Sequence, residues 1–310
     1  MSETPKLFQN RVSESGSTLL VAAVYALVIW AAAGVVTHGW WLQMACMGLT
    51  TYIIVELTNT NALLRVRSRM ISSTFLVLGC SANFLFPSLS GALASLLFTA
   101  SLIPFFNSYQ KANTQRELYV AFLAIGAASI SDVVILWLVP VLWLLCFTQL
   151  QSLSRRSWTA SLLGLLTPYW CLLPVLIFTG RWNLLTEHIA GVYTFQFPVR
   201  FDIFSPQVLL TAVFVTILMA IGQVHFWYKS FEDRIHIRHL YGFLGLISWT
   251  SIALLLFQPQ HYDLMLRILI ICGSSFVAHF FIHTRTKLTN ILFVGLLVVA
   301  VAIAVLNLLV

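Results

Sequence analysis

The chain is dominated by apolar runs of about twenty residues, each long enough to cross the hydrocarbon core of a membrane as a helix. Of its 310 residues, 59% are hydrophobic and only 9% are charged. A soluble chain carries about 25% charged residues, so this composition cannot cover a water-facing surface. We therefore predict an integral membrane protein, and we exclude a disordered chain, a disulfide-stabilised secreted domain and a nucleic-acid-binding domain.

Eleven apolar runs predict a bundle of about eleven transmembrane helices, which forms one all-α domain over residues 1–310. The predicted spans are residues 17–36, 40–58, 70–86, 88–107, 118–130, 132–150, 158–179, 208–228, 240–257, 262–283 and 288–309. The first run is longer than the roughly 7 to 15 apolar residues of a signal peptide. We therefore interpret it as an uncleaved helix that follows a cytoplasmic tail, residues 1–16.

Residues 118–150 could form either one long tilted helix or two short helices. Small and polar side chains interrupt the apolar run between Gly126 and Asp132, which favours two segments that meet at a polar bend. The positive charges favour the same choice, because removing the bend would move every later loop to the opposite side of the membrane.

Lysines and arginines are distributed unequally between the two sides of this topology. If the N-terminus is cytoplasmic, all but three of the 17 lysines and arginines fall on the inside. The three on the outside are Arg181, Arg200 and Arg267. The positive-inside rule then predicts a multi-pass membrane protein with a cytoplasmic N-terminus and a C-terminus outside.

One long connection separates the predicted spans, residues 180–207, and the topology places it outside. Within it Leu185, Ile189 and Val192 recur at helical spacing, with polar residues between them. Such a single apolar stripe predicts an amphipathic helix that lies in the outer membrane interface.

Four stretches of the sequence carry a resemblance to a known family. They are residues 67–75 (RSRMISSTF), 102–109 (LIPFFNSY), 121–129 (AFLAIGAAS) and 155–169 (RRSWTASLLGLLTPY). Together they resemble an uncharacterised family of bacterial polytopic inner-membrane proteins, and the likeness covers nearly the whole chain. The resemblance implies a multi-pass helical fold, and because the family has no established activity it implies no functional residues.

Some members of that family are labelled carotene-cleaving monooxygenases. Carotenoid-cleaving oxygenases resemble a soluble β-propeller with four iron-binding histidines. The 8 histidines of this chain are instead scattered through predicted membrane helices, which argues against that activity here.

The bend at residues 126–132 and the short helices after it also resemble multi-span glycosyltransferases that use polyprenyl-phosphate sugars. Those enzymes carry an acidic catalytic residue in their first outer loop. Here that loop is Thr37, His38 and Gly39, without an acid, so the likeness stops at the architecture.

Ionisable groups at membrane depth are costly and are therefore functional candidates. Asp132 lies at the polar bend, where it is either a helix N-cap or a general base or cation ligand in an outward-facing cavity. Asp263 and Arg267 lie four residues apart, so they either pair locally or leave Arg267 to bind a phosphate. Arg200 and Asp202 in the outer loop could join them, which makes these five residues the predicted site.

The remaining polar groups suggest less chemistry. Arg65, Arg67 and Arg69 form a basic patch that the positive-inside rule alone explains. His279 and His283 have a spacing that permits metal binding, but no third ligand follows at a defined distance, so we expect them to cap the end of a helix. No nucleotide-binding or hydrolase motif occurs, and we expect neither a cofactor nor a metal.

Two functions of different class follow from these features. The first is an enzyme, similar to a glycosyltransferase, that acts at the outer leaflet on a lipid-linked saccharide or a similar amphiphile. The second is a non-catalytic transporter or an assembly subunit of an envelope complex, although the chain lacks the repeats that many transporters show. The expected partners are membrane lipids, a lipid-linked substrate and other envelope membrane proteins, and not nucleic acid.

Overall fold

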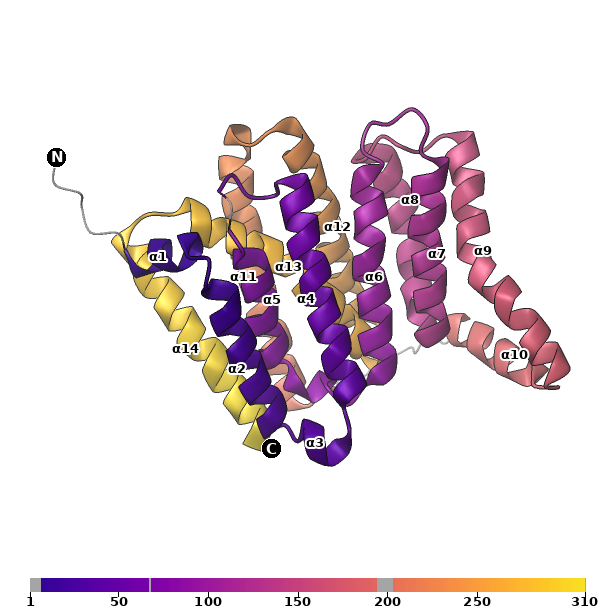
Figure 1. Ribbon diagram of the computed structural model, residues 1–310, viewed down its shortest axis with the longest axis horizontal. Helices are drawn as coiled ribbons and strands as arrows, with labels where there is room; N and C mark the ends of the chain where they lie inside the picture. The colour runs from indigo at the N-terminus through magenta and orange to yellow at the C-terminus, as the bar shows by residue number, and fades with distance from the viewer. Residues whose placement is uncertain (1–6, 67, 194–202, 310) are drawn as a thin grey trace. The chain divides into compact units, whose positions relative to one another are not determined.

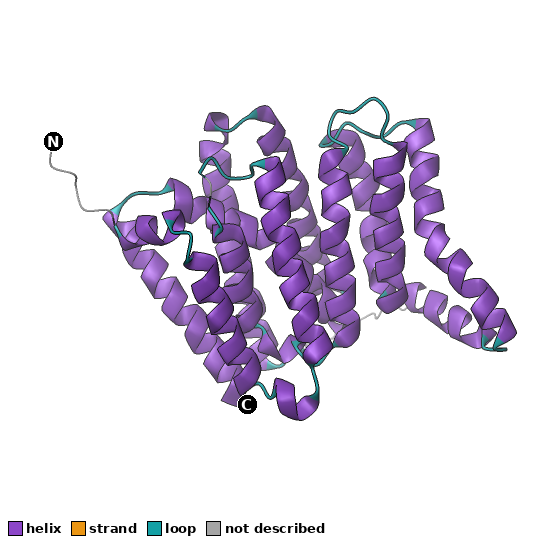
Figure 2. Cartoon of the chain, viewed as in Figure 1, coloured by secondary structure: helices purple, strands orange, loops and turns teal. Residues whose placement is uncertain are grey.

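The computed structural model describes residues 7–66, 68–193 and 203–309. Within these residues the chain is helical and contains no strand (Figure 2). Six of the described helices are long and apolar enough to cross a membrane, or seven if the bent pair α1 (Phe8–Glu14) and α2 (Thr18–Ala32) is one span. The chain therefore has the helices of a multi-pass membrane protein, but this count does not confirm eleven spans.

The chain divides into two compact units, each made of segments distant in the sequence. Unit 1 comprises Met1–Pro87, Phe204–Arg238 and Leu269–Val310, and unit 2 comprises Ser88–Ile203 and His239–Ile268. The helices of unit 1 are α1, α2, α3 (Val35–His38), α4 (Trp41–Asn61), α5 (Met70–Ser81), η1 (Asn83–Leu85), α11 (Pro206–Lys229), η5 (Ser230–Glu232) and α14 (Lys287–Leu309) (Figure 1).

Unit 2 contains most of the middle of the chain. Its helices are α6 (Leu89–Asn107), α7 (Gln115–Ser131), η2 (Val133–Leu138), α8 (Val139–Thr148), α9 (Arg155–Phe178), α10 (Trp182–Ala190), η3 (Gly191–Tyr193) and η6 (Pro259–His261). Helices α12 (Ile235–Phe257) and α13 (Tyr262–His283) contribute residues to both units.

The observed helices differ from the predicted ranges at two places near the N-terminus. The predicted tail contains α1, whose axis meets that of α2 at 94°. The predicted first span ends early at Ala32, because Gly34 and Gly39 adopt positive φ values of 83° and 70° on either side of the short α3. Glycine adopts this left-handed backbone without the steric penalty that a Cβ would bring.

Helices α7 and α9 pack closely because a glycine of each lies against the backbone of the other. A Cβ on Gly126 would lie 2.5 Å from the carbonyl oxygen of Leu165, and one on Gly164 would lie 2.3 Å from that of Tyr119. Small residues allow such close approach of membrane helices, and polar contacts then add to it. Here the Ser129 and Tyr169 hydroxyls lie 2.7 Å apart across the same interface.

Helix α5 lies at the centre of unit 1 and packs against α2, α4 and α14 (Figure 1). Amide side chains fix its C-terminal end: Asn83 donates to the Ala304 carbonyl at 2.8 Å, and Asn307 donates to the Ser81 carbonyl at 2.8 Å. The Asn307 bond satisfies a backbone carbonyl at the end of α5, where no intrahelical donor is available. The two bonds anchor α14 at the C-terminal end of α5.

Candidate functional site

Asp132 lies between α7 and η2, where the sequence predicts two segments meeting at a bend. Its backbone is extended, and its Oδ1 accepts a hydrogen bond from the Val134 N–H at 3.1 Å. Asp132 is therefore an N-cap, which satisfies one of the free N–H groups at the start of the helical turn. The Asp132 side chain is only half-buried, so its second carboxylate oxygen remains accessible to other groups.

Several charged or ionisable groups of unit 2 act on the Asp132 carboxyl. The Asp132 carboxylate accepts from the Val134 N–H, and the imidazole of His261 interacts with it electrostatically. The Asp263 carboxylate and the His188 imidazole on α10 also interact with it electrostatically. A half-buried carboxyl among ionisable groups is a candidate general acid or base.

Aromatic and backbone contacts hold this cluster in place. The Trp137 ring in η2 meets the His261 ring edge to face, with centroids 5.3 Å apart. The indole N–H of Trp137 donates to the carbonyl of Val192 in η3 at 3.1 Å. The segments that carry Asp132 and His261 are thus tied together at the end of the loop that contains α10.

Asp263 and Arg267 form the local pair that their spacing predicts. Arg267 Nε donates to Asp263 Oδ1 at 2.9 Å, and Ser88 Oγ donates to the other carboxylate oxygen at 2.6 Å. Ser88 also caps α6 by accepting from the Gly91 N–H at 3.2 Å. Gly91 makes this arrangement possible, because a Cβ there would lie 2.0 Å from Asp263 Oδ2.

The structure therefore brings three of the five predicted site residues into one unit. Asp263 connects the other two, because it pairs with Arg267 and its charge reaches Asp132. Arg200 and Asp202 lie outside the described residues. Ser88, His188 and His261 belong to the same cluster, and the sequence gives no local sign of them because their partners lie far away in the chain.

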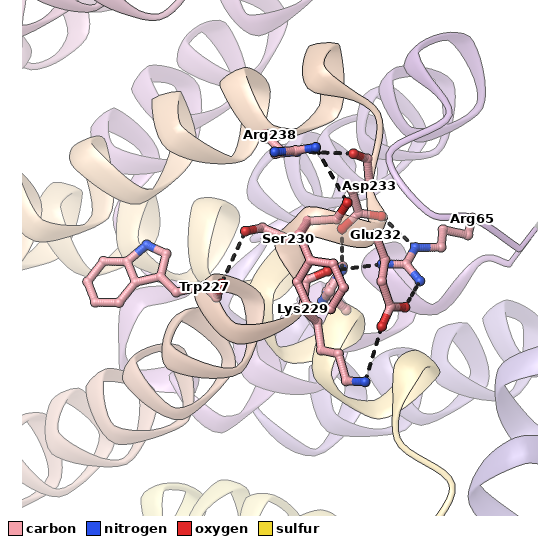
Figure 3. A network of polar contacts seen from close by, with 9 residues as sticks. Arg65, Trp227, Lys229, Ser230, Glu232, Asp233 and Arg238 are labelled. Atoms are coloured by element: carbon pink, nitrogen blue, oxygen red, sulfur yellow. Dashed lines mark hydrogen bonds and ion pairs between the residues drawn. The ribbon is translucent and has the colours of Figure 1, made fainter.

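A second polar network lies in unit 1, around the loop between α11 and α12 (Figure 3). Arg65 Nε donates to Asp233 Oδ1 at 2.6 Å, and Arg65 Nη1 donates to Glu232 Oε2 at 2.5 Å. The Asp233 side chain is 2% exposed, whereas that of Glu232 is 37% exposed. Arg65 thus binds two carboxylates of a distant loop, in addition to supplying positive charge on the predicted cytoplasmic side.

Asp233 also contacts the end of α13, because its Oδ2 lies 3.3 Å from Nε2 of the fully buried His279. Burial alone would raise the pKa of Asp233, but its hydrogen bonds with His279 and Arg65 outweigh this effect and hold the pKa at about 2. The carboxylate therefore stays ionised and connects three segments of unit 1.

Two further histidine rings adjoin His279. The His283 ring centroid lies 4.3 Å from that of His279, and the His225 ring centroid lies 5.8 Å from it. Nδ1 of His225 and Nε2 of His283 are buried and have no hydrogen-bond partner. Among the described residues, no three His, Cys, Asp or Glu side chains gather in an arrangement that could hold a metal ion.

Comparisons with known proteins found no match for this chain. No protein-family model matches the chain, and neither a curated protein nor a solved structure matches it.

Proposed function

We propose that the chain is a multi-pass protein of the bacterial inner membrane that acts at the outer leaflet on a lipid-linked saccharide or a similar amphiphile. In this proposal it has eleven spans, forms a single membrane domain and belongs to the uncharacterised family that its sequence resembles. Residues 180–207 lie on the outer surface of the membrane. Asp132 is the catalytic group, and Arg200, Asp202, Asp263 and Arg267 bind the substrate.

Contacts within unit 1 support the proposed topology. Three segments predicted to be cytoplasmic meet there: Ser68 donates to the Ser13 carbonyl, and Gln9 donates to the Thr284 carbonyl. Arg65 adds the loop before α12 through its bonds to Asp233. Loops that contact one another must lie on the same side of a membrane, as the proposed alternation requires.

Contacts within unit 2 agree with this alternation. The predicted inside segments meet where the Gln110 N–H donates to the Leu150 carbonyl at 2.9 Å. The predicted outside segments meet where Ser88, at the start of α6, donates to Asp263, in the first turn of α13. The bend at Asp132 is needed for both sets of loops to fall on consistent sides.

Cysteine labelling in intact cells tests this topology. In a variant whose 5 native cysteines are replaced by alanine, a cysteine at exposed Arg155 should react with a membrane-impermeant maleimide only after permeabilisation. The matched control is a cysteine at Arg181, also exposed but predicted to be outside, which should react in both conditions. Labelling at position 155 in intact cells would show that the number of spans before it is wrong.

The observation that carries the enzyme proposal is the half-buried Asp132 carboxyl at the bend after α7, in one unit with the Asp263–Arg267 pair. As a general base, Asp132 would take the proton of an acceptor hydroxyl while the oxygen of that hydroxyl forms a bond to the sugar carbon. The bond from that carbon to the polyprenyl phosphate would break, and the phosphate would leave as an anion. In this proposal Arg267 would bind the phosphate oxygens through its guanidinium while its Nε stays paired with Asp263.

Turnover of a defined substrate tests this role of Asp132. The full chain in phospholipid vesicles should release polyprenyl phosphate from a radiolabelled polyprenyl-phosphate hexose. Asp132→Asn should slow this release by about 100-fold or more, because the amide cannot take up the proton. Asparagine keeps the oxygen that accepts from Val134, so the helix cap is preserved.

The matched control is Glu187→Gln, which removes an exposed carboxylate of α10 in the same unit and should leave the rate unchanged. Equal rates for wild type and Asp132→Asn would overturn the assignment of Asp132. A wild-type protein that neither binds nor cleaves the probe would overturn the enzyme proposal as a whole.

A second candidate is a proton-coupled transporter, and the buried network of unit 1 favours it. Chains of aspartate and histidine carry protons in membrane transporters. His279 and His283 lie with their ring centroids 4.3 Å apart beside the ionised Asp233, and Nε2 of His283 is buried. Proton flux driven by a pH gradient across the same vesicles tests this candidate, because a network that only ties loops together carries none.

A further inference from the structure

An apolar groove runs along unit 1, separate from both polar clusters. Its volume is about 700 Å³. Its lining residues come mainly from α2, α5 and α14, with further residues from α1, α11 and α13. The groove exists because small side chains face it where larger ones would fill it: Ala22 on α2, Ser73 on α5 and Ala300 on α14.

The groove has the size and surroundings of a site for a hydrocarbon chain. From Phe293 to Val301 its α14 wall extends about 12 Å, at a rise of about 1.5 Å per residue. Its rim contains exposed apolar side chains, with Val21 63% and Leu297 43% exposed. Such exposed apolar residues face lipid in a membrane protein, so a chain can enter from the bilayer.

Positive charge gathers at one end of this groove. Arg11 lines that end directly. Exposed Arg69 adjoins the lining residue Met70, and it follows Ser68, which bonds to α1. Exposed Arg285 follows Thr284, which accepts from Gln9 of α1, and exposed Lys287 begins α14. These four cations outnumber the acidic side chain among the described residues of α1, which is Glu14.

We propose that this groove binds an anionic phospholipid, with one acyl chain between α2 and α14 and the phosphate beside Arg11. The apolar lining matches the acyl chain, and the cations match the headgroup. A basic residue near the membrane surface contributes to binding of anionic lipid, and guanidinium in particular binds phosphate oxygens. The site is distinct from that of the lipid-linked substrate, because it uses none of the residues around Asp132.

Native mass spectrometry of the full chain tests the proposal, with phosphatidylglycerol and phosphatidylcholine of identical acyl chains as probes. The wild type should retain phosphatidylglycerol more strongly. Arg11→Gln should weaken phosphatidylglycerol about fivefold and phosphatidylcholine by less, because the choline cation already offsets the attraction of that lipid to the basic end of the groove. Val21→Trp should weaken both lipids by about tenfold, because the indole would displace about two methylene groups from the groove.

Leu20→Trp is the matched control, because Leu20 is 66% exposed on the same helix but does not line the groove. It should bind both lipids as the wild type does. Phosphatidylglycerol that carries a diazirine in its acyl chain should crosslink to the walls of the groove in wild type and in Leu20→Trp, but not in Val21→Trp. Equal retention of the two lipids by wild type, or crosslinks confined to other helices, would overturn the proposal.

Discussion

Asp233→Ala is expected to lower the free energy of unfolding by about 3 kcal/mol, because it removes the buried carboxylate that pairs with Arg65 and with the buried His279. Arg65 would lose the acceptor 2.6 Å from its Nε, and His279 would lose the carboxylate 3.3 Å from its Nε2. The Asp233 side chain is 2% exposed, so water cannot replace these contacts without opening the loop. Titration of the full chain with denaturing detergent, followed by tryptophan fluorescence, measures the loss.

Glu232→Gln provides the matched control in the same loop. Glu232 also binds the Arg65 guanidinium, but its side chain is 37% exposed. Solvent screens an exposed ion pair, so this substitution should have a small effect. Equal losses for the two variants would contradict the argument that burial makes Asp233 important.

The pH dependence of unfolding checks the electrostatic part of this prediction. Asp233 has a pKa of about 2 in the folded chain, below the roughly 3.9 of an unfolded aspartate. A depressed pKa stabilises the folded state above the unfolded value, and this stabilisation disappears as the pH falls from about 4 towards 2. The difference between wild type and Asp233→Asn should therefore be full at pH 6 and shrink over that interval.

The sequence predicts local features of the fold well and distant contacts poorly. The bend at Asp132 and the pairing of Asp263 with Arg267 depend on neighbours within a few residues, so composition and spacing suffice to predict them. Arg65 and Asp233 lie 168 residues apart. Each follows a helix end where charge is expected anyway, so nothing in the local pattern indicates that they meet.

The same reasoning explains why the sequence did not reveal the other residues of the candidate site. Ser88 looks like an ordinary helix cap, and only the fold shows that its hydroxyl donates to Asp263. His188 and His261 look like interfacial polar residues until the fold places them around Asp132. Hydropathy also overestimates the length of some predicted spans. Helix α5 and the segment Val133–Thr148 are apolar, but they are shorter than the helices that are long enough to cross a membrane.

Gly126→Leu is expected to destabilise the chain by about 3 kcal/mol, the upper end of the usual range for overpacking. Even the first side-chain atom would lie 2.5 Å from the Leu165 carbonyl oxygen, and backbone atoms of a neighbouring helix cannot rotate away. Helices α7 and α9 would have to separate. That movement would also lengthen the contact between the Ser129 and Tyr169 hydroxyls, which are 2.7 Å apart.

Gly48→Leu on α4 separates this steric effect from the general properties of glycine in helices. Gly48 is exposed, and a Cβ there would meet nothing within 4 Å. Leucine has a higher helix propensity than glycine, by somewhat less than about 1 kcal/mol, so Gly48→Leu should be neutral or slightly stabilising. Both variants gain this propensity, and only Gly126→Leu forces two backbones apart. Similar detergent-unfolding midpoints for the two variants would show that α7 and α9 do not depend on the close approach at Gly126.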